Sequence, residues 1–557
     1  MYMIQNPVLP GFNPDPSIIR VGEDYYIATS TFEWFPGVQI HNSRDLVHWR
    51  VLGYALDRPS QLDLKGIEAS GGVWAPCLSY NEKEGIFYLI YTIMRSTNGG
   101  AFDLDNYVVT ANNIEGPWSE RIYLNSSGFD PSLFHDDDGR KWLLNLEWDF
   151  RQGYEHPGSI VIQEYDAKLQ TLVGEARSIS RGATDMGCLE APHIYKRNGY
   201  YYLVTAEGGT GFGHGVVISR SRDLFGPYES DPCNPIITSA REINLNRRGV
   251  DDYLKPYQYN PDSILQKSGH GSIVETQTGE WYIAHLCARP LKSEVRSMLG
   301  RETALQRCQW TEDGWLRMAN GGNRAEMTVE APKLEAHPFA AEAIREDFDS
   351  GKWNVHLNSL RVPLEEAWMS LEARPGYLRL RGRESLFSLH EQSLVARRLQ
   401  HFRATVETCV EFQPENFHEM AGLTLFYDQN MFYYLRIYYS ETFGCPCIGI
   451  LSADNGKRTE WLESRVPIPD WERVYLRAVI HDGTLNFYCS SDGSLWWQVG
   501  TELDASKCSD EYSSSGHFTG AFVGICCQDS YRKRKYADFD YFEYKETTET
   551  TETTMTT

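Results

Sequence analysis

Three acidic residues stand at the starts of similar short segments, each close to a proline. Asp15 lies in NPDPS, Asp130 in GFDPS and Glu190 in CLEAP. A single Asp before a Pro is usually a turn residue. Three carboxylates at the starts of repeated segments indicate a shared chemical role instead.

This set of acids suits the hydrolysis of a glycosidic bond. One carboxylic acid protonates the leaving oxygen, and one carboxylate activates water or attacks the anomeric carbon, around an oxocarbenium-like transition state. A third carboxylate can raise the pKa of the acid by like-charge repulsion and hold it in place. Asp15, Asp130 and Glu190 supply the three groups if the fold brings them together.

A repeat in the first half of the chain predicts how they meet. Apolar runs here are short, alternating and separated by Gly, Asn or Asp, which is typical of strands, so we expect an all-β protein. Five units begin alike and continue into an aromatic-rich strand, at 15–30, 75–92, 130–146, 191–206 and 271–286. Five repeats of four short strands predict a five-bladed β-propeller, whose innermost strands begin around one central funnel.

The repeat ends near Met318, and a different strand-rich region follows. Its pattern predicts a β-sandwich of the jelly-roll, concanavalin-like kind. We therefore expect a catalytic propeller over 1–325, a sandwich over 331–545 that helps to close the active site, and a disordered low-complexity tail over 546–557.

The composition of the chain limits the classes of molecule that it can bind. The net charge of −23 disfavours nucleic acid and anionic membranes, whereas a neutral sugar is unaffected by it. Aromatic residues make up 13% of the chain and suit the stacking of sugar rings, although an all-β core also favours them. No secretory signal or membrane span is visible, and the 12 Cys lack zinc-site spacing, so we expect a cytoplasmic protein without a metal or cofactor.

Around Asp15, Asp130 and Glu190 the sequence closely resembles glycoside hydrolase family 43, in particular its two-domain β-xylosidases. The resemblance covers the whole chain except the Thr-rich tail. The matching segments are NPVLPGFNPDPSI (6–18), GGVWAP (71–76), GFDPSLFHD (128–136), LEAPHIYK (189–196), GHGSIVET (269–276), GRETALQ (300–306) and FTGAFVGICCQD (518–529).

The resemblance implies roles for the acids and for one arginine. Asp15 is implied to be the general base that deprotonates water, Glu190 the general acid, and Asp130 the group that tunes the pKa of Glu190 and positions it. Arg301 resembles a sugar-binding arginine whose fork holds hydroxyls. The alternative for Arg301 is a surface ion pair with Glu302.

Four further residues are implied to touch the sugar. Phe32 and Trp74 match aromatic positions that wall the pocket, although core packing is an equal alternative for either one. His270 is implied to lie near the axis, where it could contact the sugar, hold Glu190 or a water, approach a bound divalent cation as in some relatives, or serve only as a hydrogen-bonded structural residue. Phe522 resembles a second-domain aromatic that closes the pocket.

The expected function is that of an exo-acting, inverting β-1,4-xylosidase that releases D-xylose from the non-reducing ends of xylo-oligosaccharides, with side activity on α-L-arabinofuranosides. The alternatives are an α-L-arabinofuranosidase or arabinan-degrading enzyme, a retaining fructosidase-like propeller, and a non-catalytic sugar-binding propeller. Relatives form dimers or tetramers, which leaves a homo-oligomer open. The segment GGTGFGHG (208–215) lacks phosphate-loop spacing and is interpreted as a flexible loop near the funnel.

Overall fold

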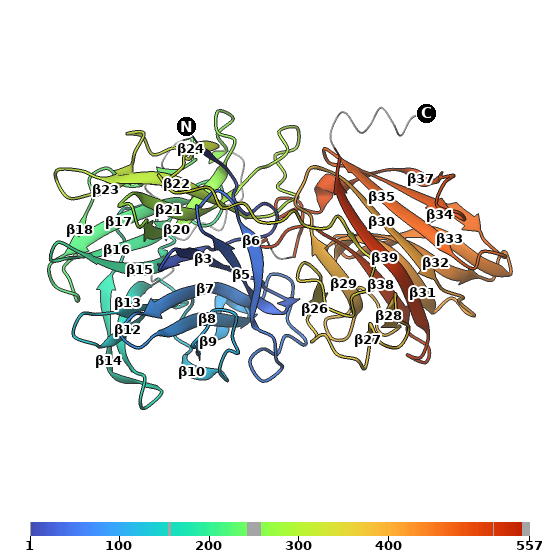
Figure 1. The fold of residues 1–557 in the computed structure, drawn as a ribbon, viewed down its shortest axis with the longest axis horizontal. Helices are drawn as coiled ribbons and strands as arrows, with labels where there is room; N and C mark the ends of the chain where they lie inside the picture. The colour runs from blue at the N-terminus through green and yellow to red at the C-terminus, as the bar shows by residue number, and fades with distance from the viewer. Residues whose placement is uncertain (1, 154–157, 242–257, 516, 548–557) are drawn as a thin grey trace.

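The computed structural model describes residues 2–153, 158–241, 258–515 and 517–547, and they are almost entirely strands (Figure 1). Helical structure in these ranges is confined to short 3-10 turns, among them η1 (Asn98–Gly100) and η3 (Ala505–Lys507). The predicted all-β class, a five-bladed propeller followed by a sandwich, is confirmed. The predicted tail falls mostly on 548–557, outside the described residues.

Each blade is an antiparallel sheet of four consecutive strands, apart from short additions. Blade 1 contains β2 (Ser17–Val21), β3 (Asp24–Thr29), β5 (Gly37–Ser43) and β6 (Arg50–Leu56). Blade 2 contains β7 (Gly72–Asn81), β8 (Ile86–Ser96), β9 (Asp103–Ala111) and β10 (Ile122–Asn125). Blade 3 contains β11 (Ser132–His135), β12 (Lys141–Glu147), β13 (Ser159–Asp166) and β14 (Thr171–Ser180).

The last two blades follow the same plan. Blade 4 contains β15 (Glu190–Arg197), β16 (Tyr200–Glu207), β17 (Gly215–Ser221) and β18 (Glu229–Ser230), with β19 (Ile237–Thr238) also paired to β17. Blade 5 contains β20 (Gln266–Glu275), β21 (Trp281–Ala288), β22 (Glu302–Trp310) and β23 (Leu316–Met318). The strands β1 (Met3–Gln5) and β24 (Thr328–Glu330) pair with each other, so both ends of the propeller meet.

The five blades share one backbone feature at their starts. In each blade the residue just before Pro16, Pro76, Pro131, Pro192 or Gly271 has a positive φ: 56° at Asp15, 34° at Ala75, 53° at Asp130, 54° at Ala191 and 50° at His270. Non-glycine residues avoid this region because Cβ approaches the carbonyl oxygen, at a cost of roughly 1–2 kcal/mol each. In blades 1 and 3 this residue precedes the first strand, and in blades 2, 4 and 5 it lies at a register shift within that strand.

Small hydroxyl side chains after these turns join neighbouring blades. Ser272 Oγ donates to the Pro16 carbonyl at 2.8 Å and accepts from the Ile18 amide at 3.0 Å, which closes the ring between blades 5 and 1. Ser17 Oγ accepts from the Leu78 amide of blade 2 at 3.0 Å. Hydrogen bonds across blade boundaries therefore satisfy backbone groups that a separate four-stranded sheet would leave unpaired at its inner edge.

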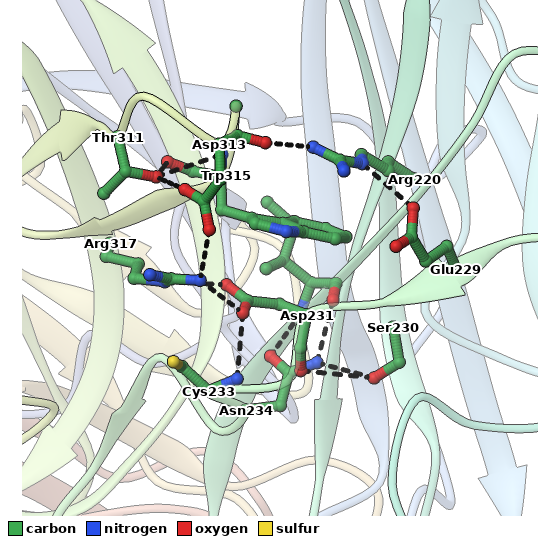
Figure 2. A network of polar contacts seen from close by, with 12 residues as sticks. Arg220, Glu229, Ser230, Asp231, Cys233, Asn234, Thr311, Asp313, Trp315 and Arg317 are labelled. Carbon is green, nitrogen blue, oxygen red and sulfur yellow. Dashed lines mark hydrogen bonds and ion pairs between the residues drawn. The ribbon is translucent and has the colours of Figure 1, made fainter.

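A polar network ties blade 4 to blade 5 (Figure 2). Arg317 of β23 holds the buried Asp231 by two hydrogen bonds, at 2.9 and 3.1 Å. Arg220 of β17 donates to the Asp313 carbonyl at 2.8 Å and lies 4.0 Å from the centre of the Trp315 ring. This bidentate pair and the cation–π contact fix the angle between the two blades that carry Glu190 and Arg301.

The sandwich consists of two large antiparallel sheets. One sheet has the order β27 (Met369–Ser370), β28 (Leu378–Arg381), β39 (Tyr536–Glu546), β30 (Arg403–Glu411), β35 (Val474–His481), β36 (Thr484–Ser490) and β37 (Trp497–Asp504), with β25 (Arg345–Glu346) on β39. The other has the order β34 (Lys457–Pro467), β33 (Cys445–Asp454), β32 (Met431–Ser440), β31 (Glu419–Asp428), β38 (Phe522–Asp529), β29 (Ser393–Arg398), β26 (Asn358–Leu360) and β4 (Trp34–Phe35). Strand β35 alternates strictly between buried and half-buried residues, as a strand with one face on the core must.

The last strand of that second sheet comes from the propeller. Strand β4 leaves blade 1 between β3 and β5 and pairs with β26, with Phe35 opposite Ser359 and Trp34 opposite Leu360. The fully buried Trp34 ring stacks on Phe522 with centroids 3.8 Å apart and planes at 13°. A shared sheet and a shared aromatic core therefore join the two domains, so the second domain is placed firmly beside the funnel.

This stacking makes a stability prediction. Replacing Trp34 with Ala removes a fully buried ring from the domain junction, so we expect the free energy of unfolding to fall by about 3–5 kcal/mol. Chemical unfolding followed by fluorescence would measure this. Trp497→Ala, which removes a ring that is 47% exposed, should cost much less. Equal losses in the two variants would mean that Trp34 does not support the junction.

Candidate active site

Asp15 lies at the start of blade 1 and is 5% exposed. Its Oδ2 accepts a hydrogen bond from Ser30 Oγ at 2.6 Å, and its Oδ1 accepts one from Arg301 Nη1 at 3.2 Å. Burial acts to raise the pKa of this carboxyl, but Arg301, His270 and Ser30 outweigh it and leave the pKa below its usual value. Asp15 is therefore an ionised carboxylate, ready to accept a proton.

Asp130 occupies the corresponding position in blade 3. Its Oδ2 accepts from the backbone amide of Ala191 at 3.0 Å, next to Glu190 in the chain. Burial and the negative charges of Glu190 and Asp15 raise the pKa of Asp130 well above its usual value. The contact with Ala191 places this carboxyl directly beside the backbone that carries Glu190.

Glu190 stands one residue earlier in its blade than the two aspartates do in theirs, because Ala191 takes the positive-φ position. A register shift between Glu190 and His193 marks this irregular start of β15, and such bulges re-aim side chains. The Glu190 side chain is 17% exposed. Burial and the charge of Asp15 raise its pKa to about 8, against the opposing effect of Arg301. The structure thus brings the three predicted carboxyls together with unequal protonation.

Arg301 is the cation that creates this inequality. It is 4% exposed, and besides Asp15 it contacts Thr210 Oγ1 at 3.0 Å through Nη1 and the Phe518 carbonyl at 3.0 Å through Nη2. The alternative pairing with Glu302 does not form, because Glu302 binds Arg289 at 2.7 Å. Arg301 lies among the carboxylates, as its predicted sugar-binding role requires.

Aromatic rings line one side of the group. Phe32 and Trp74 lie 6.0 Å apart, and both contact Phe518, at 6.4 and 5.7 Å between centroids. Trp74 also meets Phe129 edge-on at 5.6 Å. Phe32 and Trp74 are only 2% and 8% exposed, so each ring is packed mainly against its neighbours. Only a small part of either ring is accessible from the site.

The structure places Phe522 differently from its prediction. Phe522 has no exposed surface and lies behind the wall, stacked on Trp34 and 5.9 Å from Phe12. Four residues earlier, Phe518 is half-buried and lies 5.3 Å from the guanidinium of Arg301. The second-domain aromatic beside the carboxylates is therefore Phe518. Sequence reasoning could not separate the two rings, because both belong to FTGAF.

Two histidines complete the polar wall, and only one of them was expected. His270 Nδ1 lies 3.7 Å from Asp15 Oδ1, and burial lowers its pKa to about 4. His214 Nε2 lies 3.3 Å from Glu190 Oε1. His214 and Thr210 both belong to the segment interpreted as a flexible loop. A signal was present, since Gly-His-Gly occurs at 213–215 and again at 269–271.

No group of three or more His, Cys, Asp or Glu in the described ranges is arranged to hold a metal ion. No helix among these same residues is long and apolar enough to cross a membrane.

A five-bladed propeller with three buried carboxyls, one arginine and an aromatic wall at its axis defines a glycoside hydrolase. The chain belongs to glycosyl hydrolases family 43, whose family model matches residues 4–316. A second model, the beta xylosidase C-terminal concanavalin A-like domain, matches residues 345–545. Both matches agree with the propeller and the sandwich described above.

Several characterised relatives are similar along nearly their whole length. The crystal structure of a xylan beta-1,4-xylosidase from Bacillus halodurans C-125 has 52% identity and a TM-score of 0.92, covering 98% of this chain and 100% of that one. A xylan 1,3-beta-xylosidase from a Vibrio species is 44% identical over 97% of this chain and 98% of its own. A xylosidase/arabinosidase 43B from Humicola insolens is 44% identical over 97% of both chains.

The raised pKa of Glu190 predicts a pH-dependent cost to the fold. Between about pH 4 and pH 8 the folded protein holds a proton that the unfolded chain releases, so rising pH favours unfolding. Glu190→Gln removes the need to bury a charge. We expect its free energy of unfolding, relative to the unchanged protein, to be greater at pH 8 than at pH 5 by on the order of 2 kcal/mol.

Calorimetry at the two pH values would measure this difference. The control is Glu441→Gln, which removes one negative charge from an exposed turn and should give the same result at both pH values. A Glu190→Gln effect that does not change with pH would contradict a buried, protonated Glu190.

Proposed function

We propose that this enzyme is an exo-acting, inverting β-1,4-xylosidase that releases D-xylose from the non-reducing ends of xylo-oligosaccharides. The observation that carries the proposal is the opposite protonation of Asp15 and Glu190, two carboxyls in one site. Arg301 keeps Asp15 ionised, whereas burial and Asp15 itself keep Glu190 protonated. Two carboxyls whose pKa values are pushed apart supply the base and the acid of glycoside hydrolysis.

The proposed reaction is a single displacement. Asp15 takes a proton from water as the water oxygen bonds to the anomeric carbon, and Glu190 gives its proton to the glycosidic oxygen as the carbon–oxygen bond breaks. The configuration inverts because water attacks the face opposite the leaving group. Asp130, held by the Ala191 amide, keeps Glu190 in place, and repulsion between the two carboxyls disfavours ionisation of both at once.

The binding residues are proposed from their places around the acids. Arg301 offers its fork to the hydroxyls of the terminal sugar, and Phe32 and Trp74 form the wall against which the ring rests. Phe518 replaces Phe522 as the second-domain side of the pocket. A wall supplied by a second domain favours a pocket that admits one chain end, which supports exo action.

The domain bounds, the binding partner, the cellular location and the oligomeric state belong to the same proposal. We retain a propeller over 1–325 and a sandwich over 331–545, and a neutral oligosaccharide rather than nucleic acid as the partner of this acidic chain. None of the 12 cysteines forms a disulfide with another described residue, which favours a reducing, cytoplasmic location. Assembly into dimers or tetramers is compatible with this setting.

Arabinofuranosidase activity is the second candidate, as a side activity or as the main one. It is favoured by the name of the Humicola relative, a xylosidase/arabinosidase. The Vibrio relative is named for the 1,3 linkage, so the linkage is also tested directly.

Proton NMR during the first minutes of hydrolysis tests the proposal. We expect β-1,4-xylobiose to be cleaved faster than β-1,3-xylobiose or an α-L-arabinofuranoside, and α-xylose to accumulate before mutarotation. The Glu190→Ala variant serves as the control and should release no xylose from xylobiose. Early β-xylose would make Asp15 a nucleophile, and faster cleavage of the arabinoside would move the main activity to the second candidate.

A further inference from the structure

The partners of His214 determine which of its ring nitrogens carries a proton. The residue is fully buried, and its Nδ1 lies 3.2 Å from the carbonyl oxygen of Lys267. A carbonyl can only accept, so Nδ1 must be the donor. Nε2 lies 3.3 Å from Glu190 Oε1 and has no hydrogen-bond partner among the described residues. The nitrogen that faces Glu190 is therefore the one free to accept a proton.

The His214 ring is also uncharged at pH values well above its pKa of about 4. Burial lowers the pKa of His214 to about 4, helped by the positive charge of Arg301 and opposed by the hydrogen bond to Lys267 and the charge of Asp15. A neutral ring with its proton on Nδ1 presents a bare lone pair at Nε2. An ionised Glu190 would face that lone pair unfavourably, whereas a protonated Glu190 can donate to it.

We propose that His214 is a positioning residue that stores the proton of the general acid: in the free enzyme the protonated Oε1 of Glu190 donates to Nε2 of His214. The inference rests on the proposed function, in which Glu190 is the acid. When the substrate binds, the 17%-exposed Glu190 side chain turns from His214 to the glycosidic oxygen and gives up the same proton. No proton is gained or lost by His214 in this cycle.

The second domain fixes the carbonyl that sets this tautomer. Lys267 is fully buried, has a φ of 56°, and forms ion pairs with Glu511 at 2.7 Å and Asp510 at 3.5 Å. Asp510 is itself held by the Tyr427 hydroxyl at 2.6 Å. An unusual backbone conformation persists only where its surroundings enforce it, and here the sandwich carboxylates anchor the side chain.

The His214 ring is clamped on its other side by Gly269. A Cβ at Gly269 would lie 2.3 Å from the ring, so no larger residue fits there without moving His214. The His214 ring is therefore held in contact with the Lys267 carbonyl and close to Glu190.

Other charges act on the same group and must be separated from His214. The charge of Asp15 favours protonation of Glu190, and Arg301 opposes it. His270 is neutral and faces Asp15. Removing His214 changes none of these charges, so the effect of its lone pair can be measured alone.

The test is the pH dependence of kcat/KM on β-1,4-xylobiose in the His214→Phe variant. We expect its basic limb, which reports Glu190 in the free enzyme, to move down by about one pH unit, a roughly tenfold extra loss at pH 8. The acidic limb, set by Asp15, should stay in place. An aryl xyloside, whose leaving group needs little protonation, should lose far less activity.

Two further variants keep the result interpretable. His135→Phe, a histidine in the blade-3 strand β11, is the matched control and should leave both limbs unchanged. Glu511→Gln should move the basic limb in the same direction by a smaller amount, which provides the test if His214→Phe does not fold. A basic limb that stays in place, or an equal loss at every pH, would overturn the role of His214. Retention of the anomeric configuration by the unchanged protein would instead contradict the proposed function. Failure of that proposal can therefore be told apart from failure of the role of His214.

A separate observation concerns a cavity of about 490 Å³ where the segment 59–65 of the propeller meets the sandwich. Its lining includes five cations, Lys65, Arg361, Arg381, Arg383 and Lys533, and three carboxylates, Asp63, Glu365 and Glu391. The two lysines are paired, with Glu391 at 3.0 Å and Glu384 at 3.1 Å.

Two of the arginines are held in place by neutral acceptors, although the charges of Glu391, Glu384 and Glu365 act on Arg383. Arg381 Nε donates to the Lys533 carbonyl at 2.6 Å, and Arg383 Nε donates to Ser393 Oγ at 2.8 Å. Neither forms an ion pair with a carboxylate in the described part of the chain. We infer that this cavity binds a small carboxylate or phosphate, because the guanidinium of Arg381 is fixed at its lining and pairs with no carboxylate in the described part of the chain.

Titration calorimetry with inorganic phosphate and with glucuronate, at constant ionic strength, tests this site. We expect saturable binding of at least one of them, no binding of neutral xylose, and at least tenfold weaker binding in Arg381→Gln. Arg458→Gln, at an exposed position of β34, should bind as the unchanged protein does. Phosphate alone would indicate a phosphate ester and glucuronate alone a sugar acid. Binding of neither, or equal binding in Arg381→Gln, would exclude the site.

Discussion

The site depends on a shortage of positive charge. Three carboxyls, at Asp15, Asp130 and Glu190, lie buried within electrostatic reach of one another, and Arg301 is the guanidinium that pairs with one of them. A buried carboxylate without a counter-ion is costly, so the unpaired acids retain protons instead. Asp15 is therefore ionised, and Glu190 is protonated. Acid and base differ because one arginine is shared unequally among three similar groups.

The fivefold repeat delivers these groups to the axis and also distinguishes them. The positive-φ turn at each blade start carries an aspartate in blades 1 and 3 but alanine in blades 2 and 4. Trp74 and Glu190 occupy the position before those alanines, where β7 and β15 each have a register shift. The repeat thus offers two kinds of axial position, one on the turn and one just before it, and the site uses both.

Much of this could be predicted from the sequence because the signals are local. The spacing of the five units determines the blades, and the acids stand beside prolines that mark each start. Phe518, His214 and strand β4 were missed for a common reason: each acquires its role through a contact with a segment distant in the chain. Phe518 and Phe522 share one motif, and only the stacking of Trp34 on Phe522 decides which ring is left beside Arg301. Alternation along β38 alone does not reveal that.

The second domain is accordingly part of the electrostatics of the site as well as its wall. The carbonyl of Phe518 accepts from Arg301, and its amide donates to Ser70 Oγ of the propeller. Asp510 and Glu511 neutralise Lys267, whose positive charge otherwise acts on His214 beside Glu190. If the sandwich moved away, Arg301 would lose a partner and Lys267 its counter-ions, and the balance that keeps Glu190 protonated would shift. The shared sheet at β4 and the Trp34–Phe522 stack keep the domains docked, so the protonation of the acids is coupled to the packing between domains.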